Sequence, residues 1–286
     1  MPVTNFPPDL LIIAQRNTAG TNRPRFYSRL TTNGDTYLTS SSTIAETSET
    51  TLDNPRFTDN VSYATSASGK VSGSYVGYAF KRAPGFFDVV CYTGNGTSGT
   101  AITHNLGAIP ELVIVKSRSA LTNWPVCCNI SSTANTIYLN LTNQANVQTT
   151  RFPSLPTSTT FVIGNDNSVN TNAATYVAYL FATLAGISKV GSYTGNGGTQ
   201  NIECGFAAGA RFVLIKRTDS TGDWYVWDTA RGIVSANDPH LSLNTTAAEV
   251  TTDDSVDPYS AGFAVNQVAA TNINVSSATY IFLAVA

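Results

Sequence analysis

Short apolar runs separated by polar turn residues recur along the whole chain. Residues 10–13, 112–115 and 212–215 are each four consecutive apolar side chains, the pattern of a strand that is buried on both faces. Residues 137–141 instead alternate between apolar and polar side chains, which is typical of a half-buried strand. No window combines a sustained helical period with end caps. The pattern therefore predicts an all-β fold built from many short antiparallel strands.

The expected strands are closely spaced and are bounded by Gly, Asn, Pro and Ser residues. They fall at residues 10–14, 25–28, 36–39, 75–80, 87–92, 101–104, 112–115, 124–128, 136–141, 160–163, 176–181, 187–193, 201–204, 212–216, 224–227, 241–243, 263–265 and 280–285. A further strand is expected to begin at Phe57, and the polar residues 40–54 are expected to form a long loop. This density of strands is typical of a β-sandwich or a jelly roll.

One five-residue segment, Tyr-Thr-Gly-Asn-Gly, occurs twice, at residues 92–96 and 193–197. Its flanking strands recur with the same period of about a hundred residues, which indicates a repeated structural unit. We therefore predict three tandem antiparallel β-sandwich or jelly-roll-like repeats, at residues 1–84, 85–186 and 187–286. Each Asn-Gly pair is expected to form the tight turn of a β-hairpin.

The first of these repeats is expected to be divergent. Only nine residues precede its first apolar strand, and nine residues span at most about 30 Å. That length is too short for an opening hairpin, so the first repeat is expected to lack a pair of strands and to expose a sheet edge. Because an exposed edge invites pairing with another strand, this repeat is a candidate docking unit.

Composition narrows the function classes. Charged residues make up only 12% of the chain and the net charge is −2, so nothing favours binding to nucleic acid. No apolar run reaches bilayer length, and no basic residue precedes the short run at residues 10–14, so neither membrane insertion nor a cleaved signal peptide is expected. The four cysteines form no CxxC pair and are expected to be free thiols packed as small apolar groups.

Catalytic and metal-binding patterns are sparse. His104 and His240 do not occupy matching repeat positions, and no Gly-x-Ser-x-Gly element occurs. Three carboxylates, Asp253, Asp254 and Asp257, could hold Ca²⁺, but they lack the residue order of a calcium loop, so a solvated acidic loop is expected. We therefore expect no catalytic residues, no metal and no cofactor, and we do not expect an enzyme.

The densest group of aromatic and polar side chains is the candidate binding site, and it comprises Trp224, Tyr225, Trp227, Asp228 and Arg231, with Trp124 at the matching place in the second repeat. In a strand, Trp224 would face one side, and Tyr225 and Trp227 the other. One face would pack in the core, while the other could stack on a sugar ring beside the Asp228 carboxylate. The alternative is that neighbouring strands or subunits cover both faces.

Several longer segments resemble a known family. These are residues 77–90, the first Tyr-Thr-Gly-Asn-Gly segment, residues 104–107 and 110–112, residues 212–224 and residues 278–280. They resemble a repeat domain of unknown function found in tail-fibre-like virion proteins of tailed bacteriophages, common among marine phages and cyanophages. The resemblance covers residues 73–286 closely and the first repeat loosely.

The resemblance implies a structural and adhesive component of a phage particle, at the tail fibre or tail tip, assembled in the host cytoplasm. The alternative is a capsid decoration protein; a glycan-binding lectin or a glycan depolymerase is a further alternative. A depolymerase would need two acidic residues facing one groove. The expected partners are other virion proteins, further copies of the same chain and a host cell-surface glycan.

Overall fold

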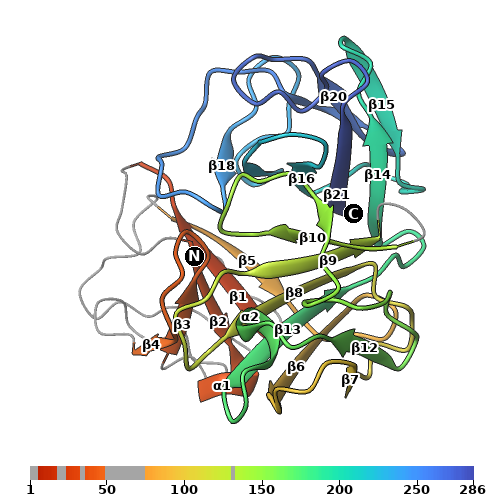
Figure 1. Cartoon of the computed structure of the whole chain (residues 1–286). Helices are drawn as coiled ribbons and strands as arrows, with labels where there is room; N and C mark the ends of the chain where they lie inside the picture. Colours follow the sequence, from red (N-terminus) through yellow and green to blue (C-terminus); the bar gives the residue numbers. More distant parts are fainter. Residues whose placement is uncertain (1–5, 18–23, 33–35, 49–74, 130–132) are drawn as a thin grey trace.

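The computed structural model describes residues 6–17, 24–32, 36–48, 75–129 and 133–286, and these residues are almost entirely in strands and loops (Figure 1). The helices among them are α1 (Arg29–Thr32) and α2 (Asn167–Asn170), each four residues long. None of the helices in these ranges is long or apolar enough to cross a membrane. The all-β prediction is therefore confirmed. The strand expected from Phe57 lies outside the described residues.

Three large antiparallel sheets carry most of the strands. The first sheet has the order β4 (Thr47–Ser48), β3 (Thr36–Thr39), β2 (Arg25–Ser28), β1 (Leu10–Gln15), β5 (Tyr75–Phe80). The second has the order β11 (Asn146–Val147), β10 (Ala134–Tyr138), β9 (Pro125–Asn129), β8 (Leu112–Ser117), β13 (Thr175–Phe181), β6 (Phe87–Thr93). The third has the order β14 (Ser188–Thr194), β21 (Thr279–Val285), β16 (Phe212–Arg217), β17 (Trp224–Asp228), β18 (His240–Ser242).

Two small sheets cover the outer faces of the second and third sheets. One pairs β12 (Thr160–Ile163) with β7 (Thr100–Thr103), and the other has the order β15 (Thr199–Glu203), β20 (Gly262–Asn266), β19 (Val256–Tyr259). A separate apolar cluster fills each of the two resulting sandwiches. Most strands match the sequence prediction within two residues, because each is a continuous or alternating apolar run. Strands β4, β11 and β19 were not predicted. β4 and β11 are two residues long, and β4 lies within the stretch 40–54 that was expected to be a loop, whereas Asp257 and Pro258 interrupt the pattern of β19.

The inner faces of all three large sheets pack into one common hydrophobic core. Phe26 of the first sheet lies 5.1 Å from Trp124 of the second, and Phe80 of the first lies 5.7 Å from Phe212 of the third, between ring centroids. The predicted boundaries after residues 84 and 186 thus fall between strands of different sheets, but the sheets they separate share a core. The division into three repeats stays a prediction.

Matching backbone hydrogen bonds join the three large sheets in a ring. The amide of Glu46 donates to Arg118 O, that of Ala145 to Thr218 O, and that of Glu249 to Arg16 O, at 2.7–2.8 Å. Two buried lysines add further ties: Lys116 Nζ donates to Thr43 O and Lys216 Nζ donates to Thr142 O. Burial lowers the pKa of each lysine to about 8.

The prediction that each Tyr-Thr-Gly-Asn-Gly segment forms a hairpin turn is wrong. β6 pairs with β13 whereas β7 pairs with β12, so the first segment is a corner that carries the chain from one sheet to another. β14 and β15 are separated in the same way. Only the second glycine of each segment, Gly96 or Gly197, has a positive φ, whereas the hairpin turn would need a positive φ at the asparagine as well.

A buried asparagine holds each corner. Asn170 accepts hydrogen bonds from the amides of Asn95 and Gly96 and donates to Thr97 O and Gly164 O. Asn274 makes the matching contacts at the second corner. Because the side chain satisfies several buried backbone groups at once, the repeated segment is explained by the fold alone.

Candidate binding site

Both tryptophans at the matching positions of the candidate site are core residues. Trp224 is buried against the common core, and its Nε1 donates to Tyr138 O of the second sheet at 2.8 Å. Trp124 is buried in the same way, and its Nε1 donates to Thr39 O of the first sheet at 3.1 Å. Each indole therefore ties one sheet to the next and presents no face to a ligand.

The opposite face of β17 is covered as well. Tyr225 and Trp227 lie on the face away from Trp224, as strand alternation predicts, and they pack in the sandwich formed with the three-stranded sheet. Trp227 is 0% exposed and Tyr225 is half-buried. Of the two arrangements that the sequence left open, the structure matches the one in which neighbouring strands cover both faces.

Asp228 and Arg231 belong to a buried ionic network between the first and third sheets. Arg231 Nε donates to Asp228 Oδ2 at 2.5 Å, and its other nitrogens donate to Glu249 Oε1 and to the Tyr78 hydroxyl, each at 3.0 Å. The Tyr78 hydroxyl in turn donates to Asp228 Oδ2 at 3.0 Å. Burial raises the pKa of Tyr78 well above its ordinary value. The network is largely buried and holds β5 of the first sheet against β17.

The acidic segment near residue 253 is only partly solvated, which corrects the sequence expectation. Asp253 is buried, with Oδ1 at 3.1 Å from His240 Nδ1, whereas Asp254 and Asp257 are half-buried. Burial raises the pKa of the neighbouring Asp238 to about 8, although the amides of Ser255 and Val256 donate to its carboxylate. The described part of the chain holds no cluster of three or more His, Cys, Asp or Glu residues placed to bind a metal.

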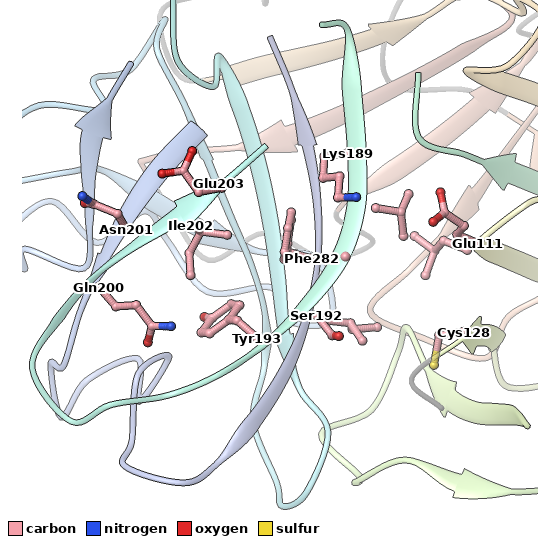
Figure 2. Close-up of a pocket in the computed structure, with 14 residues that line it drawn as sticks. Glu111, Cys128, Lys189, Ser192, Tyr193, Gln200, Asn201, Ile202, Glu203 and Phe282 are labelled. Carbon is pink, nitrogen blue, oxygen red and sulfur yellow. The ribbon is translucent and has the colours of Figure 1, made fainter. Parts of the chain in front are cut away.

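A polar cleft with a volume of about 500 Å³ lies at the edge of the third sheet (Figure 2). We call it the β14 cleft, because β14 runs through it. Its polar lining residues are Glu111, Lys189, Ser192, Gln200, Asn201 and Glu203. Tyr193, Ile202 and Phe282 supply apolar surface. Amides, a hydroxyl and charged groups beside aromatic rings can together hydrogen-bond and pack against a small polar ligand.

Gln200 supplies the most specific polar contact in this cleft. On β15 it shares the inner face with Ile202, so its side chain turns towards β14 and Tyr193, as Figure 2 shows. Gln200 Oε1 is buried and has no hydrogen-bond partner among the described residues. A buried acceptor without a partner is unfavourable, so a ligand that donates a hydrogen bond there gains affinity.

Two carboxylates also line the β14 cleft, from opposite sides of the strand (Figure 2). Glu111 Oε2 accepts a hydrogen bond from the Thr183 amide at 2.6 Å, and Glu203 Oε1 accepts one from the Tyr259 hydroxyl. Each carboxylate therefore has one oxygen in a hydrogen bond within the chain, part-buried for Glu111 and exposed for Glu203. Lys189 lies between them, and its amino group makes no hydrogen bond or ion pair within the described ranges.

The sequence contained no local signal for the β14 cleft. Its residues come from the second and third large sheets, a small sheet and the segment before β8, so only the packing of these separate segments brings them together. The four cysteines are free, as predicted, but only Cys127, Cys128 and Cys204 are buried, whereas Cys91 is exposed. Cys127 and Cys128 face different apolar clusters.

An all-β protein with a shared core and a polar surface cleft is the class that this fold and site define. The family described as "Domain of unknown function (DUF7483)" matches residues 87–286, and the chain belongs to that family. The match begins at β6 and includes the second and third large sheets with the whole β14 cleft. No curated protein and no solved structure matches the chain.

Proposed function

We propose that this chain is a structural and adhesive component of a tailed-phage particle, in the tail fibre or tail tip, and that its β14 cleft binds a carbohydrate of the host surface. The β14 cleft carries the adhesive part of the proposal. It places the unpartnered Gln200 acceptor beside the Tyr193 ring, and the Asn201 amide and the Ser192 hydroxyl lie elsewhere along its lining. Sugars present hydroxyl donors and acceptors around an apolar ring face, which is the complement of that lining.

The binding test uses a glycan array of bacterial surface polysaccharides, followed by calorimetric titration of the best ligand. Gln200→Leu should weaken binding about tenfold, because loss of one hydrogen bond in a desolvated site costs about 1.4 kcal/mol. The matched control is Gln144→Leu, since Gln144 is an exposed glutamine that does not line the cleft. Absence of any glycan ligand, or equal affinity of the Gln200 variant, would refute adhesion through this cleft.

The part of the proposal that concerns the particle has its own test. An antibody against this chain should label the tail fibre or tail tip in electron micrographs of intact particles. Labelling of the capsid would instead support the alternative of a capsid decoration protein, and absence of labelling would refute a virion role.

Hydrolysis is the competing activity, and the presence of Glu111 and Glu203 in one cleft favours testing it directly. We propose binding without hydrolysis, because each carboxylate already accepts a hydrogen bond from a donor of the same chain. The purified chain should release no reducing sugar from its glycan ligand. Release that is abolished by Glu111→Gln or Glu203→Gln would show a depolymerase.

A further inference from the structure

The three junctions between the large sheets are not filled alike. At the junction between the second and third sheets, β14 lies along β21 and borders Glu111, Leu112 and Cys128 of the second sheet. At the junction between the first and second sheets, β6 lies along β13 and contacts α1, which follows β2 of the first sheet. In both cases an edge strand of seven residues fills the space beside the neighbouring sheet.

At the third junction, between the first and third sheets, the described residues contain no such strand. β5 is the last strand of the first sheet, whereas its counterparts β13 and β21 each have a further neighbour. A groove with a volume of about 810 Å³ runs beside β5 instead. We call it the β5 groove. Its far wall is formed by Arg211, Phe212 and Asp228, the residues that match Glu111, Leu112 and Cys128 in strand pairing.

The β5 groove follows a strand edge and not a sheet face. Its lining includes every residue from Val76 to Phe80, although alternate side chains of a strand point to opposite faces. A surface that touches consecutive residues therefore meets the backbone edge, where an added strand would form its hydrogen bonds.

The floor of the groove is aromatic and held in place. The Tyr78 and Phe212 rings lie 5.2 Å apart, and the Phe80 and Phe212 rings 5.7 Å apart, between centroids. The hydrogen bond from the Tyr78 hydroxyl to Asp228 fixes β5 relative to β17. The groove is therefore preformed, which reduces the entropic cost of binding an extended segment.

Charge decides which strand fits the groove. Where β14 fills its junction, Lys189 and Glu111 line the same cleft, and Figure 2 shows the Lys189 amino group on the side of Glu111. The residue that matches Glu111 in the β5 groove is Arg211, since each precedes its strand and donates its amide to the adjacent strand. Arg211 and the nearby Lys81 are exposed and form no ion pair among the described residues. A strand that complements the charge of the β5 groove therefore carries an acidic residue at the position where β14 carries Lys189.

We propose that the β5 groove accepts an extended strand of another protein by β-strand addition, and that this strand has apolar residues at alternating positions and an acidic residue facing Arg211. A second copy of this chain is a less suitable donor, because its β6 and β14 are already paired within their own sheets. The proposal does not depend on carbohydrate binding, because the β5 groove and the β14 cleft share no lining residue.

Two synthetic peptides from the chain itself serve as probes. The peptide of residues 85–96 carries Asp88 at the position that matches Lys189, and the peptide of residues 186–197 carries Lys189. The acidic peptide should bind the intact chain about threefold more tightly or better, and it should slow amide hydrogen exchange in residues 75–80. In the Arg211→Glu variant the preference should reverse towards the Lys189 peptide. Arg211 is exposed, so this variant is expected to fold normally.

Three results would overturn the proposal. The first is the absence of binding and of amide protection in residues 75–80 with either peptide. The second is concentration-dependent self-association that protects these amides, which would identify a second copy as the occupant. The third is protection in the free chain that disappears when residues 1–5 are deleted, which would identify the chain's own terminus as the occupant. Besides these three results, an unchanged charge preference in the Arg211→Glu variant would refute the acidic residue that the proposal places opposite Arg211.

Discussion

Gly191 and Phe282 face each other across β14 and β21, and replacing both should harm the fold less than the two single changes suggest. A Cβ atom on Gly191 would lie 2.7 Å from Cζ and 2.8 Å from Cε1 of the Phe282 ring, which is closer than van der Waals contact allows. In the second sheet the matching pair is Val90 opposite Ala178. The larger side chain of the pair thus lies on the edge strand β6 in the second sheet and on the inner strand β21 in the third sheet.

The magnitudes follow from packing. Gly191→Val alone overpacks the interface and should lower the free energy of unfolding by about 1–3 kcal/mol. Phe282→Ala alone leaves a cavity and should lower it by about 3–5 kcal/mol. In the double variant the valine occupies part of the space left by the ring, so the total loss should be at least 1 kcal/mol smaller than the sum of the single losses.

Urea unfolding of the four proteins, monitored by circular dichroism, measures these differences. Gly198→Ala is the matched glycine control, because a Cβ atom there has no neighbour closer than 3.8 Å and its φ is not positive. If the loss of unfolding free energy in the double variant equals the sum of the two single losses to within about 0.5 kcal/mol, the valine does not replace the ring and the prediction is refuted.

Three further predictions concern core residues. Trp224→Ala and Trp227→Ala should each lower the free energy of unfolding by about 3–5 kcal/mol in thermal melts, because both rings are buried. Tyr225→Ala should lower it less, because Tyr225 is half-buried. Equal small losses in all three variants would contradict the packing described. Asn274→Ala should cost about 1–3 kcal/mol in urea unfolding, since it leaves the buried backbone groups of the second corner without partners; an unchanged midpoint would contradict that role. The raised pKa of Asp238 means that the folded chain binds more protons than the unfolded chain between about pH 4 and pH 8, so its contribution to stability is full below pH 4 and is lost as pH rises through about 8. Relative to Asp238→Asn, the wild-type chain should therefore lose stability from pH 5 to pH 8 in urea unfolding, and parallel pH profiles would contradict the shift.

Strand positions could be predicted because they depend on local patterns. The apolar runs at β8 and β16 are buried on both faces in the structure, as continuous runs predict. The alternation of Trp224 and Tyr225 also gave the correct faces of β17. Which layer covers each face depends on contacts between distant segments, and no local pattern carries that information.

The corners and the clefts could not be predicted from local sequence patterns, because they too depend on contacts between distant segments. Asn95-Gly96 has the composition of a hairpin turn, but the side chain of Asn170, far along the chain, selects a different corner. The β14 cleft and the β5 groove exist only because sheets from separate segments meet around one core. The first repeat was expected to expose a sheet edge, and among the described residues β5 is the terminal strand of the first sheet.

Whether the three large sheets form a single cooperative unit is tested most directly by differential scanning calorimetry of the intact chain. Because Phe26, Trp124 and Trp224 belong to one buried cluster, none of the sheets can lose its inner packing without exposing the other two. A single transition is expected, with a calorimetric enthalpy equal to the van't Hoff enthalpy. Two or three separate transitions, or a calorimetric enthalpy well above the van't Hoff value, would contradict the common core.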